Sequence, residues 1–469
     1  MRRILRVLLT AAAVFLLYVF CTGVFPFARH PGLPEAEIPA ADAYLGTEPC
    51  VDRIALVETP EEGLSARVYL LSQAEHTIDL SYCAIHMGDT TDVFLGAILD
   101  EANRGVRVRI LADRMFGGLT ASNKAAAEAI GSHPNITLRL YNPPDLLRPW
   151  TFNCRLHDKY ILIDGKLLLL GGRNIGDKYF APEGFTGLCS LDRDVMVYNT
   201  GWESGTEHSV LYAVQDYMDG IWNGDDVQEP FSRPTGRGEA ERERLLRCYR
   251  TAADGIDQLP PLDLEAATLP ANRITFLHND TGTGPKPPTV ARSLFSLLAS
   301  AEDSVTLQSP YVIASENLLP VLSELAERQV SCRILTNSQG TSPNLPAFTA
   351  YLNDRADLLG TGVELWEYQG CDAIHAKSYL VDGRVAAVGS FNLDPRSTYL
   401  DTELLLVIDS EPFAQRLAAV QEDYFAESLA LDGSGSYLPG GVSPQPVSTG
   451  KRVLTGLLSL PIRLFRYLV

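Results

Sequence analysis

The chain begins with an apolar segment that differs from everything after it. Arg2, Arg3 and Arg6 precede a nearly unbroken apolar run over residues 7–27, which is long enough to cross a bilayer as a helix. Basic residues on the short side of such a helix favour the cytoplasm. We therefore expect residues 1–29 to be a single transmembrane anchor, or a signal that is removed, with the rest of the chain across the membrane.

After the anchor the hydrophobic pattern changes period. Residues 30–60 are rich in Pro, Ala and Glu and are typical of a linker. Apolar positions at helical spacing over 61–74 and 91–104 then alternate with strand-like runs over 77–85 and 106–112. This β-α-β order is typical of a largely parallel sheet flanked by helices.

The same pattern recurs in the second half of the chain. Helical spacing over 291–301 and 318–328 alternates with strand-like runs over 305–312 and 330–336. A repeat this long predicts two fused α/β lobes rather than a solenoid. The expected organisation is a first lobe over 61–229, an inter-lobe linker with one helix over 230–272, a second lobe over 273–431, and a flexible linker with a basic amphipathic tail over 432–469.

The tail, residues 451–469, mixes basic residues with Leu, Ile and Phe. It is too short and too charged to span a membrane. Two interpretations remain open, a helix packed on the lobes or a basic amphipathic helix on an anionic membrane surface. Pro461 weakens a single-helix version of either.

One polar pattern occurs in both halves without gaps. A histidine is followed by lysine two residues later, aspartate seven later, glycine fourteen later and asparagine seventeen later. Agreement at five positions makes coincidence an unsatisfactory explanation. The copies are His157, Lys159, Asp164, Gly171 and Asn174, and His375, Lys377, Asp382, Gly389 and Asn392.

Two such motifs at one site suit phosphodiester chemistry. Strand alternation puts the histidine and lysine of H-x-K on one face, and the Asp-Gly pairs at 164–165 and 382–383 predict hairpins. Lysines and asparagine amides can hold the non-bridging oxygens. One neutral histidine can attack phosphorus while the other, protonated, serves the leaving alkoxide. We expect the catalytic residues to be the histidine, lysine and aspartate of each copy, His157, Lys159, Asp164, His375, Lys377 and Asp382. The residues themselves do not rank the two histidines.

Each histidine also requires a carboxylate to orient it. Asp194 and Glu403 occupy the same column of the repeat and are the first candidates, and Asp192 and Asp401 are the second choices. We expect no cofactor and no metal, because no cluster has metal-ligand spacing and the lysines would repel a divalent ion.

Composition narrows the function further. The formal net charge is −19, which argues against a duplex-DNA partner. A hydrophobic content of 46% with 21% charged residues indicates a substantial core. The eight cysteines show no metal spacing, and whether any of them pair remains open.

Over most of residues 61–428, the paired H-x-K-x-x-x-x-D segments, each followed by a G-G/S-x-N segment, resemble the phospholipase D superfamily. The resemblance implies pseudo-twofold α/β lobes with the site at their interface, a phosphohistidine intermediate and no metal. It further implies that His157 attacks and His375 is the acid. By the same resemblance Asn174 and Asn392 bind the substrate phosphate, and Asp194 and Glu403 orient the histidines.

The segments G-G-R-N-I-G-D-K-Y-F and G-S-F-N-L-D-P-R-S resemble bacterial cardiolipin synthases, most closely the cardiolipin synthase C branch. Many such synthases have two N-terminal spans, whereas this chain shows one. The implied reaction transfers a phosphatidyl group from phosphatidylglycerol or phosphatidylethanolamine to another phosphatidylglycerol. The expected partners are phospholipids and the bacterial inner membrane, without nucleic acid, and the sequence names no protein partner.

Three alternatives share parts of this evidence. A hydrolytic phospholipase D would use the same residues with water as acceptor. A superfamily nuclease is disfavoured by the negative charge and the anchor, and a non-catalytic membrane scaffold is disfavoured by the two intact motifs.

Overall fold

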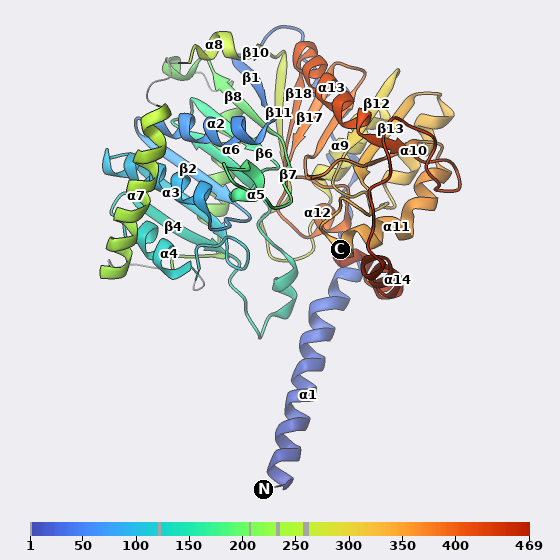
Figure 1. The fold of residues 1–469 in the computed structure, drawn as a ribbon, viewed down its shortest axis with the longest axis horizontal. Coiled ribbons are helices and arrows are strands. Elements are labelled where there is room, and N and C mark those ends of the chain that lie inside the picture. The colour runs from blue at the N-terminus through green and yellow to red at the C-terminus, as the bar shows by residue number, and fades with distance from the viewer. Residues whose placement is uncertain (1, 121–122, 206–207, 231–234, 257–261) are drawn as a thin grey trace.

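The structure, a computed structural model, describes residues 2–120, 123–205, 208–230, 235–256 and 262–469. Parts of the expected inter-lobe linker, residues 231–234 and 257–261, lie outside the described residues. Two lobes lie side by side, the first drawn in blue to green and the second in yellow to red, and a long helix, α1 (Arg2–Val24), projects away from both (Figure 1).

In the described part of the chain, the first lobe is built on a nine-stranded sheet of order β10-β1-β8-β6-β5-β2-β3-β4-β9. Strands β2, β3 and β4 are parallel to one another, and the other neighbouring pairs are antiparallel. The strands are β1 (Asp52–Val57), β2 (Thr77–Tyr82), β3 (Arg107–Asp113), β4 (Ile136–Tyr141), β5 (Lys159–Ile163), β6 (Leu167–Gly171), β8 (Asp194–Asn199), β9 (Val227–Gln228) and β10 (Leu269–Pro270).

The second lobe repeats this topology with the order β11-β18-β17-β16-β12-β13-β14-β19. The expected pair of mixed α/β lobes is confirmed, but within the sheets of the two lobes parallel pairing is confined to three strands each, because the motif hairpin and its return strand are antiparallel. The strands are β11 (Arg273–His278), β12 (Ser304–Gln308), β13 (Ser331–Asn337), β14 (Glu364–Tyr368), β16 (Ser378–Val381), β17 (Val385–Gly389), β18 (Leu404–Asp409) and β19 (Ser428–Ala430).

Helices cover the outer face of each sheet through separate apolar cores. On the first lobe, α2 begins at a capping box in which the Thr59 hydroxyl accepts from the Glu62 amide. On the second lobe, a helix precedes each of the three parallel strands along the chain. The helices are α2 (Pro60–Ser72), α3 (Asp89–Asn103), α4 (Lys124–Gly131) and α7 (Gly236–Ile256) on the first lobe, and α9 (Thr289–Ala299), α10 (Leu318–Glu327) and α11 (Leu345–Gly360) on the second.

A third apolar core joins the two lobes. In β6, Leu168 and Leu170 enter this shared core, whereas Leu167 and Leu169 enter the core under the helices. Strand alternation therefore explains why the run is apolar at every position. The helices α6 (Val210–Trp222) and α13 (Glu411–Ala426) flank the shared core. The packing of β17 against β6 and β8 brings the two motif hairpins together.

The segment expected to be a linker contains a strand. β1 pairs along its whole length with β8 and at two positions with β10, so the first sheet begins before residue 61. The strand has only six residues, Asp52–Val57, which is too short a run to be recognised beside the preceding proline-rich stretch.

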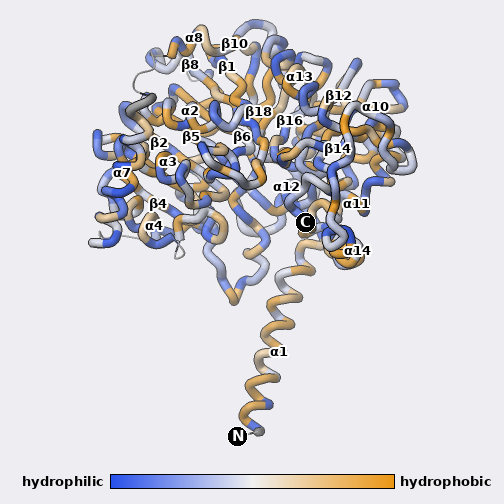
Figure 2. Tube along the Cα trace, in the orientation of Figure 1, coloured by the Kyte–Doolittle hydropathy of each residue, from blue (hydrophilic) through white to orange (hydrophobic). Residues whose placement is uncertain are grey.

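Within the described chain, residues 3–28 form a helix long and apolar enough to cross a membrane, and Figure 2 shows it as a nearly continuous hydrophobic rod. The tail forms a helix, α14 (Thr449–Leu464), that continues through Pro461. It packs on α11, where the Ser459 hydroxyl donates to Asn353 over 2.6 Å. Of the two interpretations of the tail, packing on the lobe is therefore observed.

Candidate active site

The two motifs enter matching hairpins. Asp164 and Asp382 have φ values of 52° and 50°, and each is followed by glycine, as a tight hairpin turn with two left-handed positions requires. The Asp164 carboxylate accepts hydrogen bonds from the backbone amides of residues 75–77. The Asp382 carboxylate accepts from those of residues 302–304.

These contacts place Asp164 and Asp382, which we expected to be catalytic, in the turns of the hairpins. Asp164 comes five positions after Lys159, which is about 16 Å of extended chain. The same interval separates Asp382 from Lys377. Each aspartate therefore ties its hairpin turn to the start of a neighbouring strand, at the far end of the hairpin from the histidine.

Each histidine is held by a carboxylate from the other lobe. His157 Nδ1 lies 2.9 Å from Glu403 Oε1, and His375 Nδ1 lies 2.5 Å from Asp192 Oδ2. The backbone supports both pairs, because the His157 amide donates to the Thr402 hydroxyl and the His375 amide to the Leu191 carbonyl. The short parallel pair of β7 (Ser190–Leu191) and β15 (Ala373–Ile374) fixes the second crossing. In both histidines the carboxylate contacts Nδ1 and not Nε2, and Lys377 Nζ lies 3.3 Å from Nε2 of His375.

Asp194, the first candidate from the repeat, occupies a different place. It forms buried salt bridges of 2.9 Å with Arg67 and 3.0 Å with Arg173, and its second-choice neighbour Asp192 contacts the histidine instead. Asp401, the other second choice, accepts from the Arg155 amide over 3.0 Å and pairs with Arg396. Glu403 alone of the two first candidates contacts a histidine.

The lysines and asparagines surround the two rings. The ammonium groups of Lys159 and Lys377 donate to the backbone carbonyls of His157 and His375, and Lys377 Nζ also lies 3.0 Å from His375 Nδ1. Asn392 is buried, and its Oδ1 has no hydrogen-bond partner among the described residues.

The matching asparagine of the first motif has a protein partner at each end of its amide. Asn174 Oδ1 accepts from the Ala84 amide over 3.2 Å, and its Nδ2 donates to Tyr179 Oη over 3.1 Å. The Tyr179 ring meets the His375 ring edge-on at 5.8 Å. Asn174 therefore supports a residue beside the second histidine, whereas Asn392 keeps a free acceptor.

The histidines line two adjoining cavities. His157 lines one of about 290 Å³ with Asn392, and His375 lines one of about 510 Å³ with Tyr179. Tyr311 and Asn344 belong to both linings, so the two spaces share a wall.

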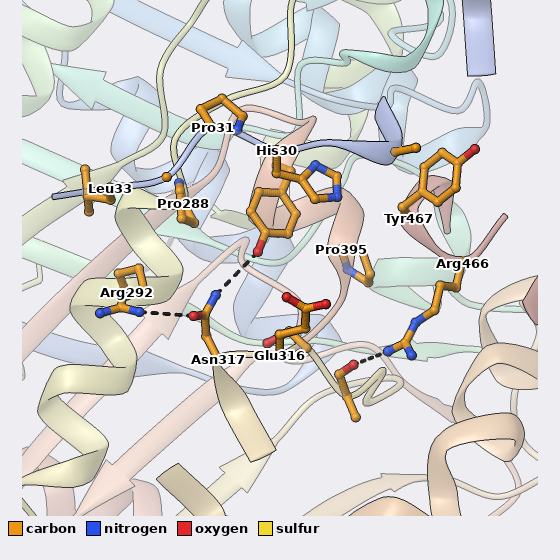
Figure 3. A pocket seen from close by; sticks show the side chains of 15 residues that line it. His30, Pro31, Leu33, Pro288, Arg292, Glu316, Asn317, Pro395, Arg466 and Tyr467 are labelled. Carbon is orange, nitrogen blue, oxygen red and sulfur yellow. Dashed lines mark hydrogen bonds between the residues drawn. The ribbon is translucent and has the colours of Figure 1, made fainter. Parts of the chain in front are cut away.

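A separate cavity of about 540 Å³ lies between the segment after α1, the second lobe and the end of the tail. In Figure 3, His30, Arg292 and Arg466 border it, and the His30 ring stacks on Tyr399 at 3.8 Å. Neither motif histidine is among its lining residues.

The electrostatics of the two histidine pairs differ. Burial and the Lys377 charge lower the pKa of His375 to about 4, and burial with the Lys159 charge lowers the pKa of His157 well below its usual value. Burial alone would raise the pKa of Asp192, but His375 and Lys377 hold it below its usual value. Burial raises the pKa of Glu403 well above its usual value. Asp192 is therefore the stronger anionic partner.

Two serine hydroxyls that contact Glu403 were not among the residues predicted from the sequence. Ser390 and Ser397 each donate to this carboxylate over 2.5 Å. Ser390 replaces the Gly172 of the first motif, where an added Cβ would lie 2.2 Å from Asp192 Oδ1. The first motif thus has Gly-Gly with Asp192, and the second has Gly-Ser with Glu403. This difference between the two motifs is visible in the sequence and could have led to Ser390.

Among the described residues, no group of three or more His, Cys, Asp or Glu side chains is placed to hold a metal ion. The charged groups nearest the histidines are lysines and buried carboxylates already paired with protein groups. The arrangement offers two imidazoles, two cations and two asparagine amides to a phosphodiester.

Comparisons with known proteins agree with this geometry. A family model described as "Cardiolipin synthase, PLD-like domain" matches residues 68–203 and 294–424, more than half of the chain. Cardiolipin synthase C of Escherichia coli (strain K12) is 30% identical over 425 residues, which cover 81% of this chain and 86% of that protein. Cardiolipin synthase A of Edwardsiella ictaluri (strain 93-146) is 27% identical over 385 residues, covering 81% and 71%.

A solved structure shares the fold. The crystal structure of phosphatidylserine synthase of Haemophilus influenzae Rd KW20 superposes with a TM-score of 0.63 at 16% sequence identity, covering 89% of this chain and 95% of that chain. The likeness extends over both lobes.

Proposed function

The chain belongs to the family of cardiolipin synthases with phospholipase D-like domains, and from that premise we propose that it makes cardiolipin. Family membership identifies a phospholipid phosphatidyltransferase of the phospholipase D type and bears out the resemblance seen in the sequence. The proposed reaction passes a phosphatidyl group, through a phosphohistidine, to the hydroxyl of phosphatidylglycerol. The donor is phosphatidylglycerol or phosphatidylethanolamine, and no metal takes part.

One observation carries this proposal: each imidazole is oriented by an acid of the opposite lobe. In a histidine whose Nδ1 faces a carboxylate, Nε2 is free to attack or to transfer a proton. Two such rings on adjoining cavities supply the nucleophile and the acid that a two-step displacement requires.

The electrostatic difference between the pairs supports one assignment of the two roles. His157, beside a Glu403 whose pKa is raised, is best suited to be neutral and to attack phosphorus. His375, beside the anionic Asp192, is better suited to carry the proton. A bound phosphodiester anion would favour protonation of His375 further. This assignment agrees with the one implied by the resemblance.

The two steps then balance. His157 Nε2 forms a bond to phosphorus, the bond from phosphorus to the leaving oxygen breaks, and His375 gives that oxygen its proton. The incoming hydroxyl then returns a proton to His375 while its oxygen bonds to phosphorus and the P–N bond breaks. Lys159, Lys377, Asn174 and Asn392 are the proposed clamp on the non-bridging oxygens.

The position of the anchor supports a lipid substrate. Phe27, just after α1, is buried against Cys154 and Leu400, which border the two motifs. Phe152, in the short helix η5 (Pro149–Asn153) that contacts α1, lines the His157 cavity. The site is therefore built beside the base of a helix that we propose to be a single inner-membrane span with the lobes outside the cytoplasm.

The test is lipid analysis of the purified full chain in liposomes of phosphatidylglycerol and phosphatidylethanolamine, with and without EDTA. We expect cardiolipin at an undiminished rate in EDTA. Phosphatidic acid as the sole product would identify a hydrolase, and loss of activity in EDTA that a divalent ion restores would overturn metal independence. Expression in cells without other cardiolipin synthesis checks the product in vivo.

A further inference from the structure

We propose that α14 and the loop before η5 form a docking surface that rests on the lipid bilayer on both sides of α1. We call six of the exposed apolar side chains of these two segments the collar. They are Leu146 and Leu147 of the loop, and Val453, Leu457, Leu460 and Leu464 of α14.

The collar residues of α14 form one stripe. Residues 453, 457, 460 and 464 recur at the spacing of a single helix face, and Leu457 is 70% exposed. The opposite face of α14 holds the lobe, because Thr455 accepts from Gln339 and Ser459 bonds to Asn353. α14 is therefore an amphipathic helix whose polar contacts are already used and whose apolar face points away from the protein.

The loop before η5 presents a second apolar tip. Leu146 and Leu147 are 60% and 73% exposed, and in Figure 2 the tip of this loop is hydrophobic beside α1. Tyr18 of α1 donates to the Leu147 carbonyl over 2.6 Å. Exposing two neighbouring leucines to water at the tip of a loop is unfavourable in free energy unless an apolar surface covers them.

Contacts with α1 place both segments at the depth of a membrane surface. α1 ends at Val24, and the collar segments touch it at Tyr18 and Phe20, the latter through the Phe465 ring at 6.2 Å. Four to six helical residues correspond to about 6–9 Å. An interfacial helix buries its apolar face about 5–10 Å into the headgroup and acyl boundary.

Charge favours an anionic lipid surface over a protein partner. The chain as a whole has a formal net charge of −19, yet residues 433–469 contain Lys451, Arg452, Arg463 and Arg466 and no acidic residue. Arg452 and Arg463 are exposed and lie beside the apolar stripe. Basic residues near an anionic leaflet each add about 1 kcal/mol of attraction. We therefore infer that the partner of the collar is a bilayer that contains anionic lipid.

Docking would also set the position of the catalytic cavity. Arg396, which lines the His157 cavity, donates to the Leu468 carbonyl at the end of the tail and to the Asn153 carbonyl of η5. Arg396 thus contacts the chain that follows each of the two collar segments. A tail seated on the bilayer would hold this cavity over the headgroups.

The test adds one tryptophan at a time to the full chain and measures its fluorescence in liposomes with and without brominated lipid. In Leu147→Trp and Leu457→Trp, we expect the added emission to fall by about twofold with brominated lipid, since both side chains would lie at the acyl boundary. The control, Leu262→Trp, alters an exposed leucine next to α8 (Leu264–Ala267), which lies at the far end of the lobes from α1 (Figure 1). Equal behaviour of all three variants would overturn the proposal.

A second readout separates bilayer docking from other occupants. Leu457→Glu with Leu460→Glu should lower transfer about tenfold on bilayers and leave transfer between short-chain lipids in solution unchanged, because charges at the acyl boundary oppose insertion. Leu262→Glu should change neither. An equal loss with both substrates, or crosslinking of Leu457→Cys between copies without quenching at position 457, would contradict lipid docking. The proposed function fails separately, if the unaltered protein makes no cardiolipin.

Discussion

Asp192 lies 2.5 Å from the ring of His375, although the two residues belong to different lobes. The reverse crossing joins Glu403 to His157 over 2.9 Å. Neither lobe therefore contains a complete histidine and acid pair, and packing of the lobes through their shared core is a condition for either pair to form. The duplicated fold explains why one chain needs both halves to build one site.

Replacing the acid should disable its histidine without unfolding the protein. In Asp192→Asn, the amide loses the charge that stabilises a protonated His375, so we expect turnover to fall by about 10³–10⁴-fold. The measurement is the rate of lipid transfer per folded molecule, with the melting temperature recorded beside it. A variant within tenfold of the unaltered rate would remove Asp192 from its role.

Asp194→Asn is the matched control two residues away. Asp194 is fully buried between Arg67 and Arg173, and loss of one partner of a buried ion pair costs about 3–5 kcal/mol of stability. We expect the free energy of unfolding to fall while the rate per folded molecule is largely kept. The opposite result would restore the assignment based on the repeat.

The two histidines should behave differently toward a labelled donor. With a phosphatidyl donor that is labelled at phosphorus and has an activated leaving group, His375→Ala should still accept label slowly, because His157 remains to attack. His157→Ala should take up no label. Both variants should lose turnover by several orders of magnitude with natural lipids, as about 10⁴-fold losses for removed acid or base groups suggest. Label on the protein in His157→Ala and not in His375→Ala would exchange the two roles.

The sequence predicted the parts of the site that repeat. His157 and His375 were found because five polar positions recur at fixed spacing, and the Asp-Gly turns were found because a left-handed pair has few alternatives. The parallel trio in each lobe was found because helix and strand periods alternate there. These signals are local, so one stretch of chain contains each of them.

What the sequence left open depends on distant partners. Asp192 and Asp194 are two residues apart, and the guanidinium of Arg67, 127 positions from Asp194, helps to decide which carboxylate is free for the histidine. β1 is recognisable only through its pairing with β8, more than a hundred residues later. Burial between lobes also sets the pKa of Glu403, and that burial exists only after folding.

Asp382→Ala should test whether the motif aspartate is structural. Its carboxylate accepts from three successive backbone amides at 2.8–3.0 Å, and their loss should cost about 1–3 kcal/mol of stability. We expect a lower melting temperature with the rate per folded molecule within about twofold. Asp382→Asn, which tolerates the positive φ, separates the turn geometry from the charge. A large loss of rate in an unchanged fold would make Asp382 catalytic after all.

The alkaline limb of the pH profile should report Lys377. Burial lowers the pKa of this lysine from its usual value to about 8, so its ammonium is charged below that pH and neutral above it. Because the charge is proposed to hold the substrate phosphate, we expect kcat/KM to be level below pH 8 and to fall about tenfold per pH unit above it. Lys377→Arg retains a cation at high pH, so its limb should move upward even where its overall rate is lower. The comparison uses rates of lipid transfer from pH 6 to 10 on both proteins, with circular dichroism to show that they stay folded. If the limb lies at the same pH in both, a different group controls it and Lys377 leaves the proposed clamp.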